Sequence, residues 1–182
     1  RRGSGTHVDE TESTAMKMID PMIQELEHEL QNTAKLLAAL PAGQFEYKPH
    51  DKAMTMQQLG SHLVDTVMWA KTTAEMELFE LDTSTYVPHL DATPQEMVAR
   101  LEVAKAASFQ AMRGLSDEQM IVPWTMKVDG QVAFSMPRGM VFRSMILNHH
   151  YRHRGQLTTY VRAVGATVPG MYGPSADEMA PA

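Results

Sequence analysis

Long stretches with helical apolar periodicity dominate this 182-residue chain and limit the folds open to it. Between about residues 15 and 40, apolar side chains recur every three or four positions, which places them on one face of a helix. Similar stripes predict helices over residues 55–81, 93–114 and 137–164. Because each helix must bury its apolar face against another, the pattern predicts an all-α protein built as a four-helix bundle.

Capping residues mark the starts of two of these helices. Thr55 and Gln58 have the spacing of a capping box, in which the side chain of each residue accepts a hydrogen bond from the backbone N–H of the other. Thr93 precedes Pro94 and is followed three residues later by Glu96. Proline is favoured in the first helical turn, so this segment also predicts a helix start.

The segment between the third and fourth helices departs from the helical rhythm. Residues 120–135 contain Asp129 followed by Gly130, which is a tight-turn signal between two alternating stretches. We therefore expect a short hairpin or an irregular excursion at this place.

The chain reads as one domain with two unstructured ends. Residues 1–12 are polar and are predicted to be a disordered end, or residues foreign to the native chain. Residues 13–166 are predicted to form the helical bundle. Residues 167–182 are rich in Gly, Pro and Ala and are predicted to be coil.

Composition narrows the function classes. The net charge is −6, whereas a nucleic-acid-binding protein usually carries a basic face, so we expect no nucleic-acid partner. No apolar run approaches the roughly 20 residues that span a bilayer, so we expect no membrane partner. The chain has no cysteine, which excludes disulfides and fits a cytoplasmic protein. Any thiol chemistry would have to use a thiol on a small molecule.

Three histidines are predicted to face the interior of the bundle. His149 and His153 are four residues apart, so both imidazoles point from one face of the fourth helix. His62 lies on the apolar stripe of the second helix. Three neutral imidazoles can form a metal site that keeps one position open, as catalytic zinc sites do. Imidazole also suits nickel, copper and iron, so the ligand type does not select the metal.

Other readings of these histidines stay open at this point. An H-x-x-x-H pair often arises by chance, and His62 alone could be a hydrogen-bonded core histidine. If the metal site forms, the nearest candidates to support the ligands or contact a substrate are Asp65, Gln156 and Tyr160.

Several other conspicuous residues have simpler interpretations. Arg152 and Arg154 are predicted to lie at the bundle surface. Trp69 and Trp124 are predicted to pack in the fold rather than to bind a cofactor. The acidic run of residues 25–29 is predicted to be a solvated helix face.

Two stretches resemble the DinB-like (YfiT-like) family of metalloenzymes. The first is LPAGQFEYKPHDKAMTMQQLGSHLVD, and the second is NHHYRHRGQLTTYVR, which is similar to the family signature NH..HHRGQlt.YlR. This resemblance implies a four-helix bundle with up-down-down-up topology, usually as a homodimer. It also implies a divalent metal, zinc or nickel, held by His62, His149 and His153. Arg152 departs from the family, which often has histidine there, but this is not a ligand position.

The resemblance also suggests a reaction class. Some relatives resemble S-transferases or isomerases that depend on a low-molecular-weight thiol. We therefore expect a divalent-metal enzyme that transfers such a thiol to an electrophilic small molecule. A metal-dependent hydrolase with Asp65 as the general base is one alternative. A non-catalytic, stress-related dimer that binds metal is another.

Overall fold

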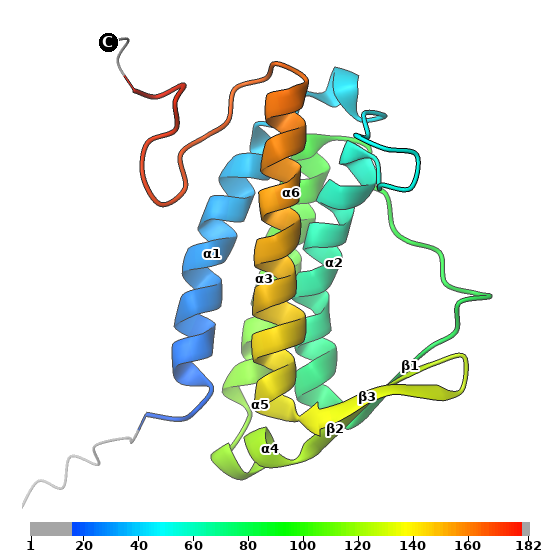
Figure 1. Cartoon of the computed structure of the whole chain (residues 1–182). Coiled ribbons are helices and arrows are strands. Elements are labelled where there is room, and N and C mark those ends of the chain that lie inside the picture. The colour runs from blue at the N-terminus through cyan, green and yellow to red at the C-terminus, as the bar shows by residue number, and fades with distance from the viewer. Residues whose placement is uncertain (1–15, 180–182) are drawn as a thin grey trace, which may run out of the picture.

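Long helical segments lie side by side in the computed structural model, which describes residues 16–179 (Figure 1). In Figure 1, α1 and α6 lead upward, whereas α2 and α3 lead downward. The last helical rod is continuous and includes a π-helical stretch, η2, directly before α6. The segments are α1 (Asp20–Ala38), α2 (Met56–Glu75), α3 (Pro94–Arg113), α5 (Arg138–Val141), η2 (Phe142–Asn148) and α6 (His149–Ala163).

The predicted helix caps are confirmed. The Gln58 N–H donates to Thr55 Oγ1 at 3.2 Å, and the Thr55 N–H donates back to Gln58 Oε1 at 2.9 Å. The Glu96 N–H donates to Thr93 Oγ1 at 3.1 Å. Two short helical elements, η1 (Ala42–Gln44) and α4 (Asp117–Ile121), complete the helical part.

A three-stranded sheet lies at one end of the helices (Figure 1). The predicted hairpin is confirmed: β2 (Pro123–Val128) and β3 (Gln131–Pro137) pair antiparallel. They are joined by Asp129 and Gly130, which have φ values of 49° and 78°. Positive φ at both central residues is the conformation that a two-residue hairpin turn requires.

The prediction that the second helix continues to residue 81 is wrong. The helix ends at Glu75, and β1 (Leu78–Leu81) instead pairs in parallel with β2, with Leu78 opposite Thr125. Alternate residues of β1 are half-buried, as expected for a strand with one inward face. The all-α class therefore omitted a small sheet, because a four-residue strand takes its identity from a partner far along the chain.

An apolar core fills the space between the helices. Leu26, Leu63, Leu101, Ile146 and Leu157 are each at most 2% exposed and belong to one buried cluster. These residues come from α1, α2, α3, η2 and α6, so the predicted apolar stripes do meet in one core.

The predictions for Arg154 and for the acidic face of the first helix are wrong at one position each. Arg154 and Glu29 are only 3% and 6% exposed, and their side chains form an ion pair. Arg154 also donates to the Glu29 carbonyl at 2.8 Å, and the Tyr172 hydroxyl donates to the Glu29 carboxylate at 2.6 Å. Helical spacing places a residue on a face of its helix. It does not reveal that a neighbouring helix carries a buried residue of opposite charge opposite that face.

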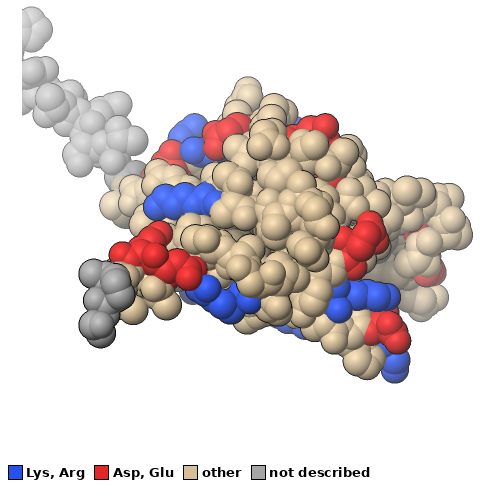
Figure 2. Space-filling model, turned by 90° about the horizontal axis from the view of Figure 1, so that it is seen from above, with Lys and Arg blue, Asp and Glu red and all other residues tan. Residues whose placement is uncertain are grey.

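The ends of the chain are described only in part. Residues 167–179 contain no helix or strand, and Tyr172 ties this segment to α1. The predicted disorder of residues 1–12 concerns a segment outside the described residues. Within residues 16–179, no helix is both long enough and apolar enough to cross a membrane. On the face seen from above, Lys and Arg are interspersed with Asp and Glu (Figure 2).

We expect Glu29→Ala to lower the free energy of unfolding by about 3–5 kcal/mol, because it leaves the buried Arg154 charge without a partner. Urea unfolding at neutral pH measures this difference. Arg143→Ala is the matched control, since it breaks an ion pair with Glu25 that is 45% and 38% exposed and should cost about 0–1 kcal/mol. Equal losses in the two variants would contradict the prediction.

Candidate metal centre and its pocket

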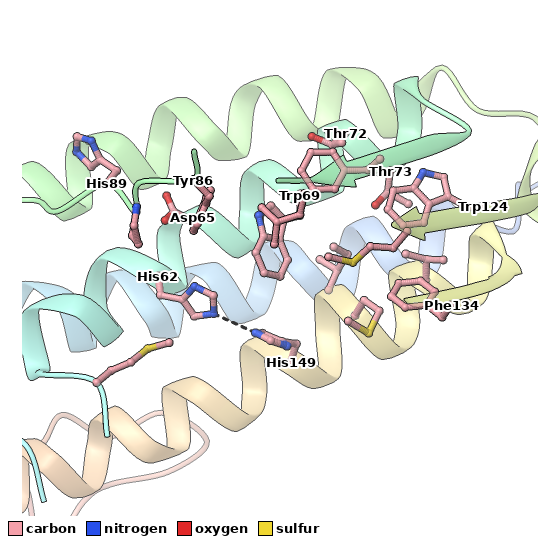
Figure 3. A pocket seen from close by; sticks show the side chains of 18 of the residues that line it. His62, Asp65, Trp69, Thr72, Thr73, Tyr86, His89, Trp124, Phe134 and His149 are labelled. Carbon is pink, nitrogen blue, oxygen red and sulfur yellow. Dashed lines mark hydrogen bonds between the residues drawn. The ribbon is translucent and has the colours of Figure 1, made fainter. Parts of the chain in front are cut away.

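His62, His149 and His153 converge between α2 and α6. One ring nitrogen of each lies within 4.8 Å of those of the other two. His62 Nε2 and His149 Nε2 are 3.0 Å apart (Figure 3). The ring centroids of His149 and His153 are 4.4 Å apart. The i, i+4 spacing on α6 thus acts as predicted, and the three side chains can hold a metal ion.

The surroundings keep these imidazoles neutral at pH 7. Burial lowers the pKa of His62 to about 4, with a further contribution from nearby His153. Burial also lowers the pKa of His149 to about 4, and the neighbouring imidazoles and Arg152 add to the effect. The pKa of His153 is lowered as well, mainly by burial. A neutral imidazole has a free nitrogen lone pair, which is what metal binding needs.

Gln156, which we predicted to support the ligands or to contact a substrate, lies beside one of the three rings. Its Oε1 lies 2.7 Å from His153 Nδ1. If the amide oxygen accepts, Nδ1 carries the proton and the lone pair is on Nε2. Such a hydrogen bond fixes the tautomer and the orientation of a metal-binding histidine.

The donor set fits a divalent ion. Tetrahedral nitrogen ligands at about 2.1 Å from zinc lie about 3.4 Å from one another. The separations of 3.0 Å to 4.8 Å among the three histidines bracket this value, so small side-chain rotations suffice. Three protein ligands leave a coordination position for a further ligand.

His150 fixes the rotation of α6, a role that we did not predict for it. It is 1% exposed, and its ring nitrogens lie 2.7 Å from Thr33 Oγ1 on α1 and 2.9 Å from Thr66 Oγ1 on α2. Burial lowers the pKa of His150 to about 3, so the ring is neutral and uses one donor and one acceptor. Thr33 and Thr66 lie at the spacing of two predicted apolar stripes, which was a signal in the sequence. The sequence did not show that His150 is the partner of both.

The other two predicted site residues, Asp65 and Tyr160, lie in different surroundings. Asp65 borders the pocket beside the histidines, and its carboxylate accepts from Arg100 Nη1 at 2.6 Å. Arg100 in turn binds Asp91. Tyr160 belongs to the hydrophobic core and packs edge-on against Tyr47, with ring centroids 5.7 Å apart.

A cavity of about 520 Å³ adjoins His62 and His149. Its walls come from α2, the sheet, the segment that links β1 to α3, and the rod that contains α6 (Figure 3). Trp69 and Trp124, which we predicted to be packing residues, both line it. The Trp69 ring lies 5.5 Å from the His62 ring and 5.4 Å from the His149 ring. Trp69 follows His62 by seven residues, or two helical turns, so the sequence did contain this signal.

The chain is similar to known proteins in sequence and in fold. Residues 13–182 match the DinB family. The chain belongs to the DinB family. A segment of 45 residues is 47% identical to the uncharacterized protein YrdA of Bacillus subtilis, and this match spans about a quarter of each chain.

Solved structures share the DinB fold. A DinB-like protein from Bacillus cereus superposes with a TM-score of 0.64 at 22% identity, over 85% of this chain and 97% of that one. One from Bacillus subtilis gives 0.62 at 15% identity, over 84% and 97%. A DinB family member from Exiguobacterium sibiricum gives 0.58 at 16% identity, over 91% and 100%. At these identities the likeness concerns the fold alone.

We expect the free energy of unfolding to decrease as the pH is lowered, and part of this decrease to come from His150. Its folded pKa of about 3 lies below the value near 6.5 expected in the unfolded chain, so below pH 6.5 the unfolded state binds a proton that the folded state does not. The stabilisation is complete above pH 6.5 and is lost as the pH falls toward 3, at about 1.4 kcal/mol per pH unit. Urea unfolding with chelator between pH 7 and 4 should give a shallower slope for His150→Asn. Parallel slopes would contradict the prediction.

Proposed function

We propose that this DinB family protein is a divalent-metal-dependent enzyme that transfers a low-molecular-weight thiol to an electrophilic small molecule. One observation carries the proposal: three neutral histidines meet, and two of them, His62 and His149, line a mostly apolar cavity. A purely structural metal site is usually closed by four protein ligands, whereas three ligands beside a cavity favour catalysis.

In this proposal His62, His149 and His153 hold zinc or nickel, and Gln156 orients His153. A divalent ion lowers the pKa of a thiol or water that it binds and so supplies a nucleophile near neutral pH. Trp69 packs against two of the ligand rings and restricts water at that side of the site. The cavity holds the electrophile against the same wall.

The thiol must come from outside the chain, which has no cysteine. In the transfer, the thiol sulfur forms a bond to the electrophilic carbon, and the leaving group departs with the electron pair of the broken bond. The thiol proton passes to solvent. A pool of reduced small thiols is a feature of the cytoplasm, so the proposal includes a cytoplasmic location.

The alternatives have less support. Hydrolysis needs a general base beside the metal, and the candidate Asp65 is already engaged by Arg100. A non-catalytic metal-binding dimer gives no role to the adjoining cavity. We further propose that α1, α2, α3 and the α5–η2–α6 rod form a four-helix bundle with up-down-down-up topology. We also propose that the protein forms a homodimer. Both stay predictions.

Elemental analysis of untagged protein purified without added metal tests the proposal. We expect near-stoichiometric zinc or nickel in the parent protein and its loss in His149→Ala and in His153→Ala, since each removes one of three ligands. His28→Ala is a matched control, because His28 is an exposed histidine on α1. A parent protein without metal that takes up neither zinc nor nickel on dialysis would refute the metal site.

We expect Gln156→Leu to weaken metal binding about 10- to 100-fold, because it removes the hydrogen bond that orients His153. Competition with a chromophoric chelator measures the dissociation constant. Thr159→Leu is the control, since Thr159 is exposed on the same helix. An unchanged dissociation constant in Gln156→Leu would exclude this role.

A further inference from the structure

We infer that the cavity takes a neutral molecule with a flat aromatic ring and that one face of the three-stranded sheet selects it. The inference deepens the proposed function, on which it rests for the identity of the reacting end. The cavity of about 520 Å³ is within the usual size range of small-molecule sites, about 300–1,000 Å³.

The charges around the cavity argue for a neutral occupant. No lysine or arginine is among the described residues that line it. Its one carboxylate, Asp65, is held by Arg100, and His89 lies 3.4 Å from the Asp91 carboxylate. A charged group entering the cavity away from the histidines would lose its hydration without finding a free counter-charge, which is costly.

The shape of the lining argues for a flat ring. Trp69 borders the cavity from α2, and Trp124 and Phe134 border it from the sheet (Figure 3). The Trp124 and Phe134 rings lie 6.0 Å apart at an interplanar angle of 31°. Aromatic surfaces of this kind favour offset or edge contacts with another ring. Met126 and Met145, which also line the cavity, can adapt to the outline of such a ring.

The sheet supplies this wall in a regular way. Phe79 and Leu81 alternate along β1, and Trp124 and Met126 alternate along β2, so one face of the sheet points into the cavity. Phe134 extends the same wall from β3, opposite Met126 in the pairing register. His62 and His149 lie on the opposite side, on α2 and α6 (Figure 3). Selection and metal binding are thus carried by different elements.

A matched pair of fluorescent probes tests the inference. N-phenyl-1-naphthylamine is neutral, and 8-anilinonaphthalene-1-sulfonate is the same ring system with one negative charge. We expect the protein as purified to bind the neutral probe at least about tenfold more tightly, which corresponds to about 1.4 kcal/mol. The preference should persist after treatment with chelator, because the sheet, not the metal, provides it. Equal binding of the two probes, or binding of neither, would overturn the inference.

Substitutions on β3 locate the binding site. Phe134→Leu keeps an apolar side chain and removes the ring, and should weaken the neutral probe about three- to tenfold. Phe134→Lys places a cation in the wall and should shift the preference toward the sulfonate. Val132→Leu and Val132→Lys are matched controls, since Val132 is 61% exposed on the same strand and does not line the cavity. Circular dichroism verifies folding in each variant.

The outcomes separate this inference from the proposed function. Probe discrimination that depends on Phe134, in a protein that takes up no metal, would support the neutral aromatic site and refute the metal enzyme. Stoichiometric metal, with the same probe affinities in the Phe134 and Val132 variants, would support the metal site and overturn the role of the sheet.

Discussion

The rotation of α6 about its own axis is the constraint on which the site depends. Two buried polar contacts set it: His150 between Thr33 and Thr66, and Arg154 on Glu29. Each group is satisfied in one helix orientation only, and an unpaired buried polar group would cost about 1–3 kcal/mol or more. His150 and Arg154 are themselves four residues apart and face away from His149 and His153. They therefore hold the side of α6 that does not face the metal site.

Helical periodicity predicted much of the fold and the three histidines. His149 and His153 share a face because of their spacing alone, and His62 lies on an apolar stripe, so their convergence required only that two helices pack. The roles of His150 and Arg154 were missed because α6 is buried over more than one stripe, against α1 as well as α2. Periodicity identifies the most apolar face of a helix, and charged residues beside that face are then predicted to be exposed.

The sheet, and with it the cavity, could not be predicted in the same way. Leu78–Leu81 is too short to distinguish strand from helix by period, and its partner β2 begins at Pro123. Only the hairpin had a local signal, in Asp129 and Gly130. Because the strands that form this part of the cavity wall could not be predicted, Trp124 appeared from sequence to be an ordinary packing residue.

The two walls of the cavity have different tolerance to change. On the α2 and α6 side, the histidines depend on neighbours such as Gln156, so a substitution there alters several groups at once. On the sheet side, Phe134 is a single half-buried side chain at the edge of a three-stranded sheet, and its replacement leaves the backbone pairing intact. Under the proposed function, substitutions in the strands would change the molecule that the cavity admits, while the histidines on α2 and α6 stay in place.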